Sequence, residues 1–343
     1  MIVAELTAPR EFHFAESDIP EPGPGEALVR VGAVGICGSD LHEYSEGVLG
    51  DSVNVYPMVL GHEPAGTVVK TGPGVTGWSP GDRAALEPAL YCYHCEFCLS
   101  GRHNLCARLR FMGSAGQAPG FFREFVTLPA RNLLGIPANM ALETATLVEP
   151  LAVALHSMQF AALAIGDTVA VFGAGPIGLL TIACARAAGA GRIWAIEPLW
   201  HRRELALHIG ADAVLDPNAM DVTRQLLVDT GQRGVDCSID CAAHGESTNW
   251  AINATRNGGR LVLTGIHSDA RVPFETSPMR RKELSLVCVR RSNHEPAAAL
   301  RMLIGNPKLF APLVTHTRPL EKVGEAFRIA ANYTDGVGKM IVK

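Results

Sequence analysis

The sequence predicts a two-domain α/β protein, with an irregular, barrel-like β domain followed by a doubly wound parallel sheet. Three observations predict this fold class. A chain of 343 residues is long for one domain. Residues 1 to about 130 contain short apolar runs broken by Gly and Pro, which is typical of short β-strands. From about residue 144, apolar strands alternate with Ala- and Leu-rich helices, which is typical of a parallel sheet.

The predicted elements follow this change along the chain. The first part offers strands in EALVRVGAVGICG, EPAGTVVKTG, GDRAALEP and FREFVTLPA. The second part alternates strand and helix in the order DTVAVFG, PIGLLTIACARAAGA, RIWAIE, HRRELALHIGA, AVLD, VDCSIDCA, STNWAINATRN, GRLVLTG and ELSLVCV. The C-terminal segment is mixed and ends in a short β-like run.

The composition argues against two classes of protein. The net charge of -4 lacks the basic excess expected of a protein that binds nucleic acid. Residues 168–185 carry no charge, yet they contain GAGPIG, so a strand, a turn and a helix explain them better than a membrane span. The N-terminal MIVAELTAPREF has no basic segment followed by an apolar stretch, so we expect no signal peptide and a cytoplasmic location.

Four of the nine cysteines lie close together, at Cys92, Cys95, Cys98 and Cys106. In a reducing compartment, clustered cysteines bind metal more often than they form disulfides. The spacing C-x2-C-x2-C-x7-C lets four thiolates enclose one tetrahedral Zn²⁺ with no open position, so the site would be structural. An iron–sulfur cluster is the alternative, because three close cysteines and a more distant fourth also occur there. Coincidence is the remaining interpretation.

A glycine-rich turn in the second part predicts a nucleotide site. Gly173, Gly175 and Gly178 stand in G-x-G-x-x-G register after an apolar strand and at the start of a helix. The helix N-terminus would bind the pyrophosphate, and we include Pro176 and Ile177 in this contact. A plain glycine turn between a packed strand and helix is the alternative.

The choice of cofactor depends on the residues after the next strand. Glu197 lies 19 residues after Gly178 and could accept both adenosine ribose hydroxyls, which favours NAD because a 2′-phosphate would be repelled. His201, Arg202 and Arg203 follow, and an arginine there could stack on adenine or attract that phosphate. NADP therefore stays open. We also predict cofactor contacts for Arg202 and for Ile266.

A second group of chemically active residues lies in the first part. GICGSDLHEY contains Cys37, Ser39 and His42, and LGHEPAG contains His62 and Glu63. Cys and His are good zinc ligands, and a catalytic zinc needs three protein ligands plus a position for water or substrate. Taken singly, Cys37 could be a small buried residue and His62 a core histidine.

Together these segments resemble the zinc-dependent medium-chain dehydrogenases over essentially the whole chain. G-x-C-G-x-D-x-H, G-H-E-x-x-G, the four-cysteine lobe, VEPLAVALH and the glycine turn occur in the family's order. The resemblance implies a GroES-like catalytic domain at residues 1–150 and 290–343 and a Rossmann NAD-binding domain at 151–289. It also implies two zinc ions per chain, a small-molecule alcohol substrate and a homo-oligomer, either a tetramer or a dimer.

The third ligand of the catalytic zinc stays open between two glutamates. In the alcohol dehydrogenase branch the position of Glu149 is a cysteine, so LVEPLAV resembles the sorbitol, threonine, glucose and butanediol dehydrogenase branch. In that branch the residue matching Glu63 commonly completes the zinc ligands, and the one matching Glu149 binds zinc or its water. His62 and Glu63 would face opposite sides of a regular strand, so we keep both carboxylates and rank Glu63 first.

The segment VRRSNHEP bears on the substrate. It resembles the F-R-x-x-N-x-x-P segment of sorbitol dehydrogenases, which places Arg290 where an arginine contacts the site glutamate and the substrate. Val289 and Arg291 depart from that pattern, and a surface charge is the alternative role for Arg290. The resemblance implies a polyol or vicinal diol as substrate. L-Threonine or an aldose is the alternative substrate, and an NAD-binding sensor, a zinc-free quinone reductase or a zinc-lobe interaction protein is the alternative class.

The resemblance also implies a reaction path. Zinc binds the alcohol oxygen and lowers its pKa. Ser39 accepts the proton and passes it towards His42, which shares a helical face with it if SDLH begins a helix. The hydride then moves to the nicotinamide.

Overall fold

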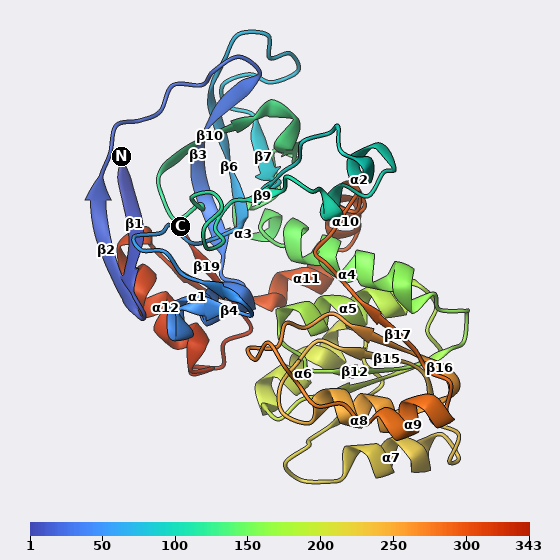
Figure 1. Ribbon diagram of the computed structural model, residues 1–343. Helices are drawn as coiled ribbons and strands as arrows, with labels where there is room; N and C mark the ends of the chain where they lie inside the picture. The colour runs from blue at the N-terminus through green and yellow to red at the C-terminus, as the bar shows by residue number, and fades with distance from the viewer. The chain divides into compact units, whose positions relative to one another are not determined.

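The computed structural model describes residues 1–343, and the chain forms two compact units (Figure 1). The first unit comprises Met1–Glu149 together with Pro296–Lys343, and the second comprises Pro150–Glu295. Because the second unit is one continuous segment between the two parts of the first, it is an insertion within the sequence of the first unit. Each unit contains its own β-sheet.

The first unit is built on a seven-stranded sheet in the order β11-β7-β6-β3-β19-β18, with β10 also paired to β3. Its strands are β3 (Glu26–Gly35), β6 (Glu63–Thr71), β7 (Arg83–Leu86), β10 (Phe125–Pro129), β11 (Leu133–Gly135), β18 (Val314–Arg318) and β19 (Lys339–Val342). Short two-stranded pairs surround it: β1 (Ile2–Ala8) with β2 (Glu11–Glu16), β4 (Val48–Leu49) with β5 (Ser52–Val53), and β8 (Ala89–Leu90) with β9 (Arg110–Phe111).

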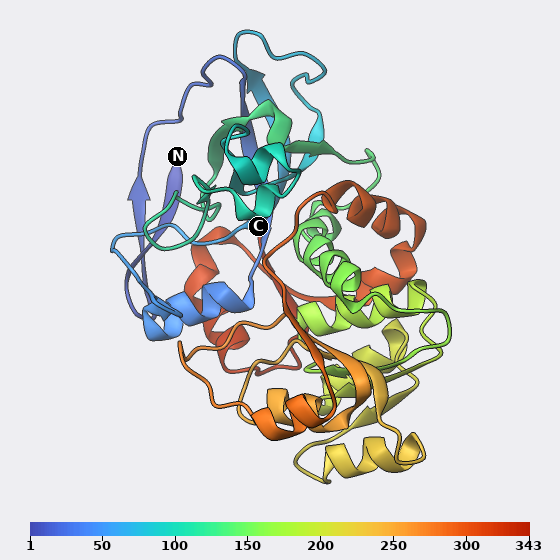
Figure 2. The same cartoon turned by 45° about the vertical axis from the view of Figure 1, so that its right-hand side comes forward.

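Helices of the first unit come from both ends of its sequence. They are α1 (Gly38–Glu46), α2 (Glu96–Leu99), α3 (Leu142–Ala145), α10 (Pro296–Gly305), α11 (Pro307–Phe310) and α12 (Val323–Ala331). The red helix α12 lies beside the blue helix α1 in both ribbon views (Figures 1 and 2). Phe327 of α12 is fully buried, and its ring contacts those of Phe12, Tyr44 and Phe122. The C-terminal segment thus supplies both a strand and part of the core.

The second unit is a six-stranded parallel sheet in the order β14-β13-β12-β15-β16-β17. Its strands are β12 (Thr168–Phe172), β13 (Arg192–Ile196), β14 (Ala213–Leu215), β15 (Val235–Asp240), β16 (Thr255–Leu263) and β17 (Ser285–Cys288). Its helices are α4 (Val148–Ala161, which begins at the end of the first unit), α5 (Pro176–Ala187), α6 (Trp200–Ile209), α7 (Val222–Asp229), α8 (Ser247–Ala254) and α9 (Thr276–Arg281).

Helices cover both faces of this sheet: α4 and α5 lie on one side and α8 and α9 on the other (Figure 1). The strand order reverses between β12 and β15, which is the point where ligands bind in doubly wound sheets. The predicted fold class is therefore confirmed. The uncharged residues 168–185 divide into β12, a glycine turn and α5, and no helix is both long and apolar enough for a membrane crossing.

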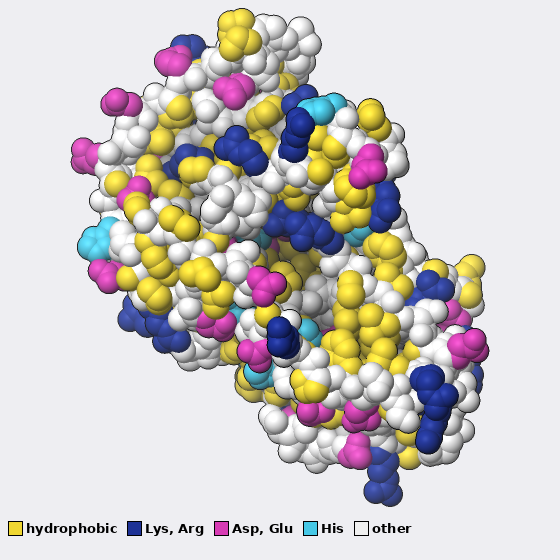
Figure 3. All heavy atoms as spheres, in the orientation of Figure 1, with side chains coloured by type: hydrophobic (Ala, Val, Ile, Leu, Met, Phe, Trp, Pro, Cys, Tyr) yellow, Lys and Arg dark blue, Asp and Glu magenta, His cyan; other side chains and the backbone are white.

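Charged side chains of both signs are interspersed on the face shown in Figure 3. Lys and Arg do not form a separate basic area on that face, in keeping with the net charge of -4.

Candidate metal centres and cofactor site

The four-cysteine lobe brings its sulfur atoms together. Cys92 follows β8, Cys95 precedes α2, Cys98 lies in α2, and Cys106 comes shortly after, with all four Sγ atoms within 4.8 Å of one another. Backbone N–H groups, chiefly that of Cys98, lower the pKa of the Cys95 thiol to about 6. The Cys92 N–H donates to Cys106 Sγ at 3.3 Å. Four convergent sulfur atoms with backbone donors fit a closed tetrahedral zinc site.

Cys37, His62 and Glu63 form the second convergent group. Cys37 is the N-cap of α1, His62 directly precedes β6, and Glu63 is the first residue of β6. One potential ligand atom from each lies within 4.8 Å of the other two, and both His62 and Glu63 are buried. Thiolate, imidazole and carboxylate are the donor set of a zinc site that leaves a position for substrate, so the residues fit the metal that the sequence predicts.

The backbone at Gly61 explains how two adjacent residues reach one point. Gly61 has φ +89°, in the left-handed region, and β6 begins only at Glu63. His62 therefore precedes the strand, and the alternation expected of a regular strand does not apply to it. A Cβ at Gly61 would also lie 2.9 Å from the Phe122 ring, so glycine is required there.

Asp40 organises this group, and the sequence analysis assigned it no role. It is fully buried, and its carboxylate accepts hydrogen bonds from the N–H groups of Cys37 (2.9 Å) and Gly61 (3.1 Å). Asp40 Oδ1 also lies 3.2 Å from His62 Nδ1, which leaves Nε2 for a metal. The signal was an acidic residue three positions after a candidate ligand, where a helix-capping carboxylate is expected.

Nearby negative charges raise the pKa of His62 by more than burial lowers it. Burial alone would disfavour the imidazolium, but the negative charges of Asp40 and Cys37 hold the pKa of His62 well above its usual value. A metal that binds the His62 ring would therefore compete with a proton for it.

Glu149 lies near the same group but outside it. The three converging ligand atoms belong to Cys37, His62 and Glu63. Burial, aided by the negative charges of Glu63 and Glu87, raises the pKa of Glu149 to about 8. The positive charges of His62 and Lys339 act in the opposite direction.

Lys339 is the other residue at this centre that the sequence analysis did not single out. Its side chain is 2% exposed, and its Nζ forms an ion pair with Glu63, which is 1% exposed. Nζ also donates to the Ile36 carbonyl at 2.9 Å. The metal centre thus contains a buried cation of its own.

The predicted proton path begins at the metal group and ends on α1. Ser39 Oγ lies 3.4 Å from His62 Nε2, so its hydroxyl reaches the metal group. His42 is partly exposed, and its Nδ1 lies 3.2 Å from Glu46 Oε1. Ser39 and His42 both lie on α1, as the proposed helix requires, and no direct hydrogen bond joins them.

The glycine turn has the conformation that a nucleotide site needs. Gly173 has φ +87°, and a Cβ there would lie 2.8 Å from the Ala242 backbone nitrogen. A Cβ at Gly178 would overlap the Gly173 carbonyl. Pro176 is the first residue of α5, so the free N–H groups of that helix face the turn.

Glu197 lies at the end of β13, beside this turn, and is 3% exposed. Its two carboxylate oxygens accept from the N–H groups of Ala174 (2.8 Å) and Leu199 (3.0 Å). Arg203 binds the Glu197 carbonyl and pairs with Asp216 at 2.9 Å. The Arg203 guanidinium is therefore engaged by groups of the protein itself.

The remaining predicted residues of the second unit differ in exposure. The Arg202 guanidinium would lie 3.7 Å from a Cβ at Gly175, so this cation lies against the glycine turn. Ile177 is partly buried and Ile266 is 52% exposed. Arg290 follows β17 and is exposed.

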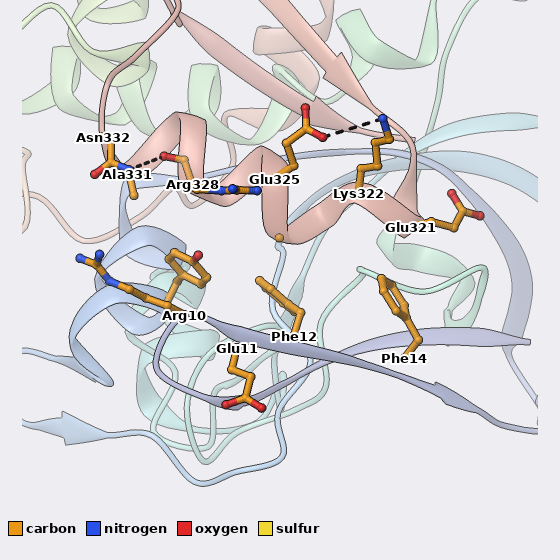
Figure 4. Close-up of a pocket in the computed structure, with 12 residues that line it drawn as sticks. Arg10, Glu11, Phe12, Phe14, Glu321, Lys322, Glu325, Arg328, Ala331 and Asn332 are labelled. Atoms are coloured by element: carbon orange, nitrogen blue, oxygen red, sulfur yellow. Dashed lines mark hydrogen bonds and ion pairs between the residues drawn. The ribbon is translucent and has the colours of Figure 1, made fainter.

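A separate groove in the first unit contains none of the predicted residues. It lies between β2 and α12 and has a volume of about 720 Å³ (Figure 4). Phe12 and Phe14 line one wall, and Glu325 and Arg328 lie on the helix opposite. We assign it no role in the chemistry described above.

Comparison with known proteins identifies the family. The alcohol dehydrogenase GroES-like domain matches residues 23–138, and the zinc-binding dehydrogenase domain matches residues 176–304. Sorbitol dehydrogenase from Homo sapiens is 37% identical over 340 residues, which covers 97% of this chain and 93% of the relative.

Two solved structures extend the likeness to the fold. That of 2R,3R-butanediol dehydrogenase from Bacillus subtilis is 29% identical with a TM-score of 0.87, covering 100% of this chain and 99% of the other. That of L-idonate 5-dehydrogenase from Escherichia coli is 28% identical with a TM-score of 0.91, covering 99% and 97%.

The chain belongs to the zinc-dependent medium-chain dehydrogenase family. It is a zinc-containing alcohol or polyol dehydrogenase with a nicotinamide cofactor, a structural four-cysteine site and a catalytic Cys/His/Glu site. The predicted family and enzyme class are confirmed, and the non-enzymatic alternatives are set aside.

Proposed function

We propose that this enzyme oxidises a secondary alcohol of a polyol or vicinal diol, with NAD as the hydride acceptor and two zinc ions per chain. The observation that carries the proposal is the carboxylate-rich metal centre, where Glu63 and Glu149 lie near Cys37 and His62. A second carboxyl beside the metal offers a polar partner to a second hydroxyl. The similar proteins named above act, by their names, on sorbitol, butanediol and L-idonate, which all carry neighbouring hydroxyl groups.

The protein residues supply binding, orientation and proton transfer. A zinc ion held by Cys37, His62 and Glu63 would polarise the substrate oxygen. Asp40 fixes the His62 ring, and Ser39 lies within 3.4 Å of it, where it can accept the alcohol proton. His42, partly exposed on the same helix, can carry that proton to solvent.

The cofactor residues support NAD over NADP. The glycine turn and the α5 N-terminus would bind the pyrophosphate, and Glu197 would accept the ribose hydroxyls. Each oxygen of Glu197 accepts one backbone N–H and retains further lone pairs for this purpose. Arg202 is the residue that would favour NADP, because its guanidinium lies against the turn.

Arg290 is the residue that we assign to the second hydroxyl. It is exposed at the end of β17 and carries a planar group with several donors. The assignment rests on the resemblance of VRRSNHEP to the sorbitol dehydrogenase segment.

A substrate panel tests the proposal directly. The zinc-loaded protein is assayed with sugar alcohols, vicinal diols, a simple secondary alcohol, threonine and aldoses, each with NAD and with NADP. The highest kcat/KM is expected for a polyol or vicinal diol with NAD. Preference for threonine or an aldose would replace the substrate assignment, and preference for NADP would shift the cofactor role from Glu197 to Arg202.

A further inference from the structure

Lys339 is almost completely buried at the catalytic metal centre. An ammonium group removed from water is costly unless charge and hydrogen bonds compensate it. Lys339 finds both, in its ion pair with Glu63 and its hydrogen bond to the Ile36 carbonyl. The lysine is therefore tied to one candidate metal ligand and to the residue that precedes another.

Three neighbouring strands build the space for this pair. Gly35 on β3 is the register partner of Glu63 on β6 and of Ile341 on β19. A Cβ at Gly35 would overlap the Glu63 carboxylate and would lie 2.9 Å from Lys339 Cε. Glycine at this position therefore makes the room in which the lysine and the carboxylate meet.

The acidic groups around the pair explain why a cation is needed. Glu63 and Glu87 both lie close enough to Glu149 for their negative charges to act on it. In the metal-free protein, His62 and Lys339 are the basic side chains whose charges offset those of these acidic groups at Glu149. A lysine in their midst supplies a fixed positive charge that stays in place when the metal leaves.

We propose that Lys339 is a positioning residue and a resident counter-ion, which holds the Glu63 carboxylate in place before zinc arrives and shares this carboxylate with zinc afterwards. A carboxylate has two oxygens, and Lys339 pairs with Oε2, so the other can serve the metal. Because the lysine and zinc repel each other and draw on one carboxylate, Lys339 weakens zinc binding. Because Lys339 shares the Glu63 carboxylate, this carboxylate neutralises less of the zinc charge, and zinc would polarise the substrate oxygen more strongly.

This inference rests on the proposed function only in taking Cys37, His62 and Glu63 as zinc ligands. It predicts an unusual pair of effects for the neutral variants Lys339→Gln and Lys339→Met. Zinc should bind about tenfold more tightly or better, because a nearby positive charge is gone. Turnover should nevertheless fall. Lys339→Arg keeps the charge and should stay near the wild type in zinc affinity.

Competition with a chelator during zinc titration of the metal-free protein measures this effect. The four-cysteine lobe serves as an internal reference, since its zinc affinity should be equal in all variants. Unchanged or weaker zinc binding at the catalytic centre of the neutral variants would overturn the inference. Lys339→Gln keeps a hydrogen-bond donor for Ile36, so it carries the test if Lys339→Met does not fold.

A second measurement separates this inference from the proposed function. In the metal-free protein, Lys339→Met should lower the unfolding temperature more in the wild-type background than in the Glu63→Gln background, because the neutral amide of that variant needs no counter-ion. Equal losses in both backgrounds would make Lys339 a packing residue. Wild-type protein that binds zinc only in the lobe would refute the metal-site assignment, while this thermal comparison would still report on the pair.

Discussion

Replacing Asp40 by asparagine tests how the catalytic centre is held together. Asp40 is fully buried and accepts from the N–H groups of Cys37 and Gly61, while its Oδ1 faces His62. Asparagine has nearly the same shape, but it carries no charge and has only one accepting oxygen. One of the two backbone donors therefore loses its acceptor, and His62 loses its anionic partner.

The size of the effect follows from these contacts. A hydrogen bond to a charged group contributes about 1.5–3 kcal/mol, so losing one and weakening another should cost about 2–4 kcal/mol. At about 2–4 °C per kcal/mol, the unfolding temperature of the first unit should fall by about 4–16 °C. Loss of a residue that orients a metal ligand typically lowers metal affinity about 10–100-fold.

Two assays measure these quantities on the same protein. Thermal unfolding of the metal-free Asp40→Asn variant reports the stability change, and chelator competition reports zinc affinity at the catalytic centre. Asp51→Asn is the matched control, because Asp51 is an exposed carboxylate in the turn between β4 and β5. If Asp40→Asn matched the control in both unfolding temperature and zinc affinity, the role assigned to Asp40 would be wrong.

Three further predictions concern the pH dependence of stability, proton transfer and the substrate. Because burial raises the pKa of Glu149 to about 8, its ionisation should destabilise the metal-free protein increasingly from about pH 4.5 to pH 8. Glu149→Gln should then gain stability over the wild type at pH 8, by at most about 5 kcal/mol, and gain nothing at pH 4; an equal difference at both pH values would refute this. Ser39→Ala and His42→Ala should keep both zinc ions and slow turnover about a hundredfold, and the deficit should shrink as the pH rises. Full activity of these variants at every pH would rule out the proposed proton path. Arg290→Ala should reduce kcat/KM more for a polyol than for a simple secondary alcohol, whereas equal losses would make the arginine structural.

The parts of the site that are local in sequence could be predicted from it. The four cysteines of the lobe lie within 15 residues, and their spacing alone indicated a shared metal. The glycine turn could also be predicted as a nucleotide site, because the strand before it and the helix after it lie in one continuous segment. Short segments of this kind fold in few ways, so their spacing constrains their geometry closely.

The contacts that join distant segments could not be predicted. Lys339 and Ile36 hydrogen-bond across 303 positions of sequence, and no pattern near either residue indicates that β19 pairs with β3. The expectation that His62 and Glu63 face opposite sides depended on a regular strand. Gly61 has a left-handed φ, and His62 stands before the strand begins. The φ angle of a single glycine cannot be read from the sequence.

The late position of β19 has a consequence for how the protein is made. β3 emerges from the ribosome early, but its neighbour β19 is synthesised only after the whole of the second unit. Pro150–Glu295 is continuous and can fold as soon as it has emerged, since domains generally fold as units during synthesis. The first unit begins first yet finishes last, and its metal centre lacks Lys339 throughout that interval. The catalytic metal centre is therefore incomplete on the nascent chain. We expect zinc to bind there only after translation has finished.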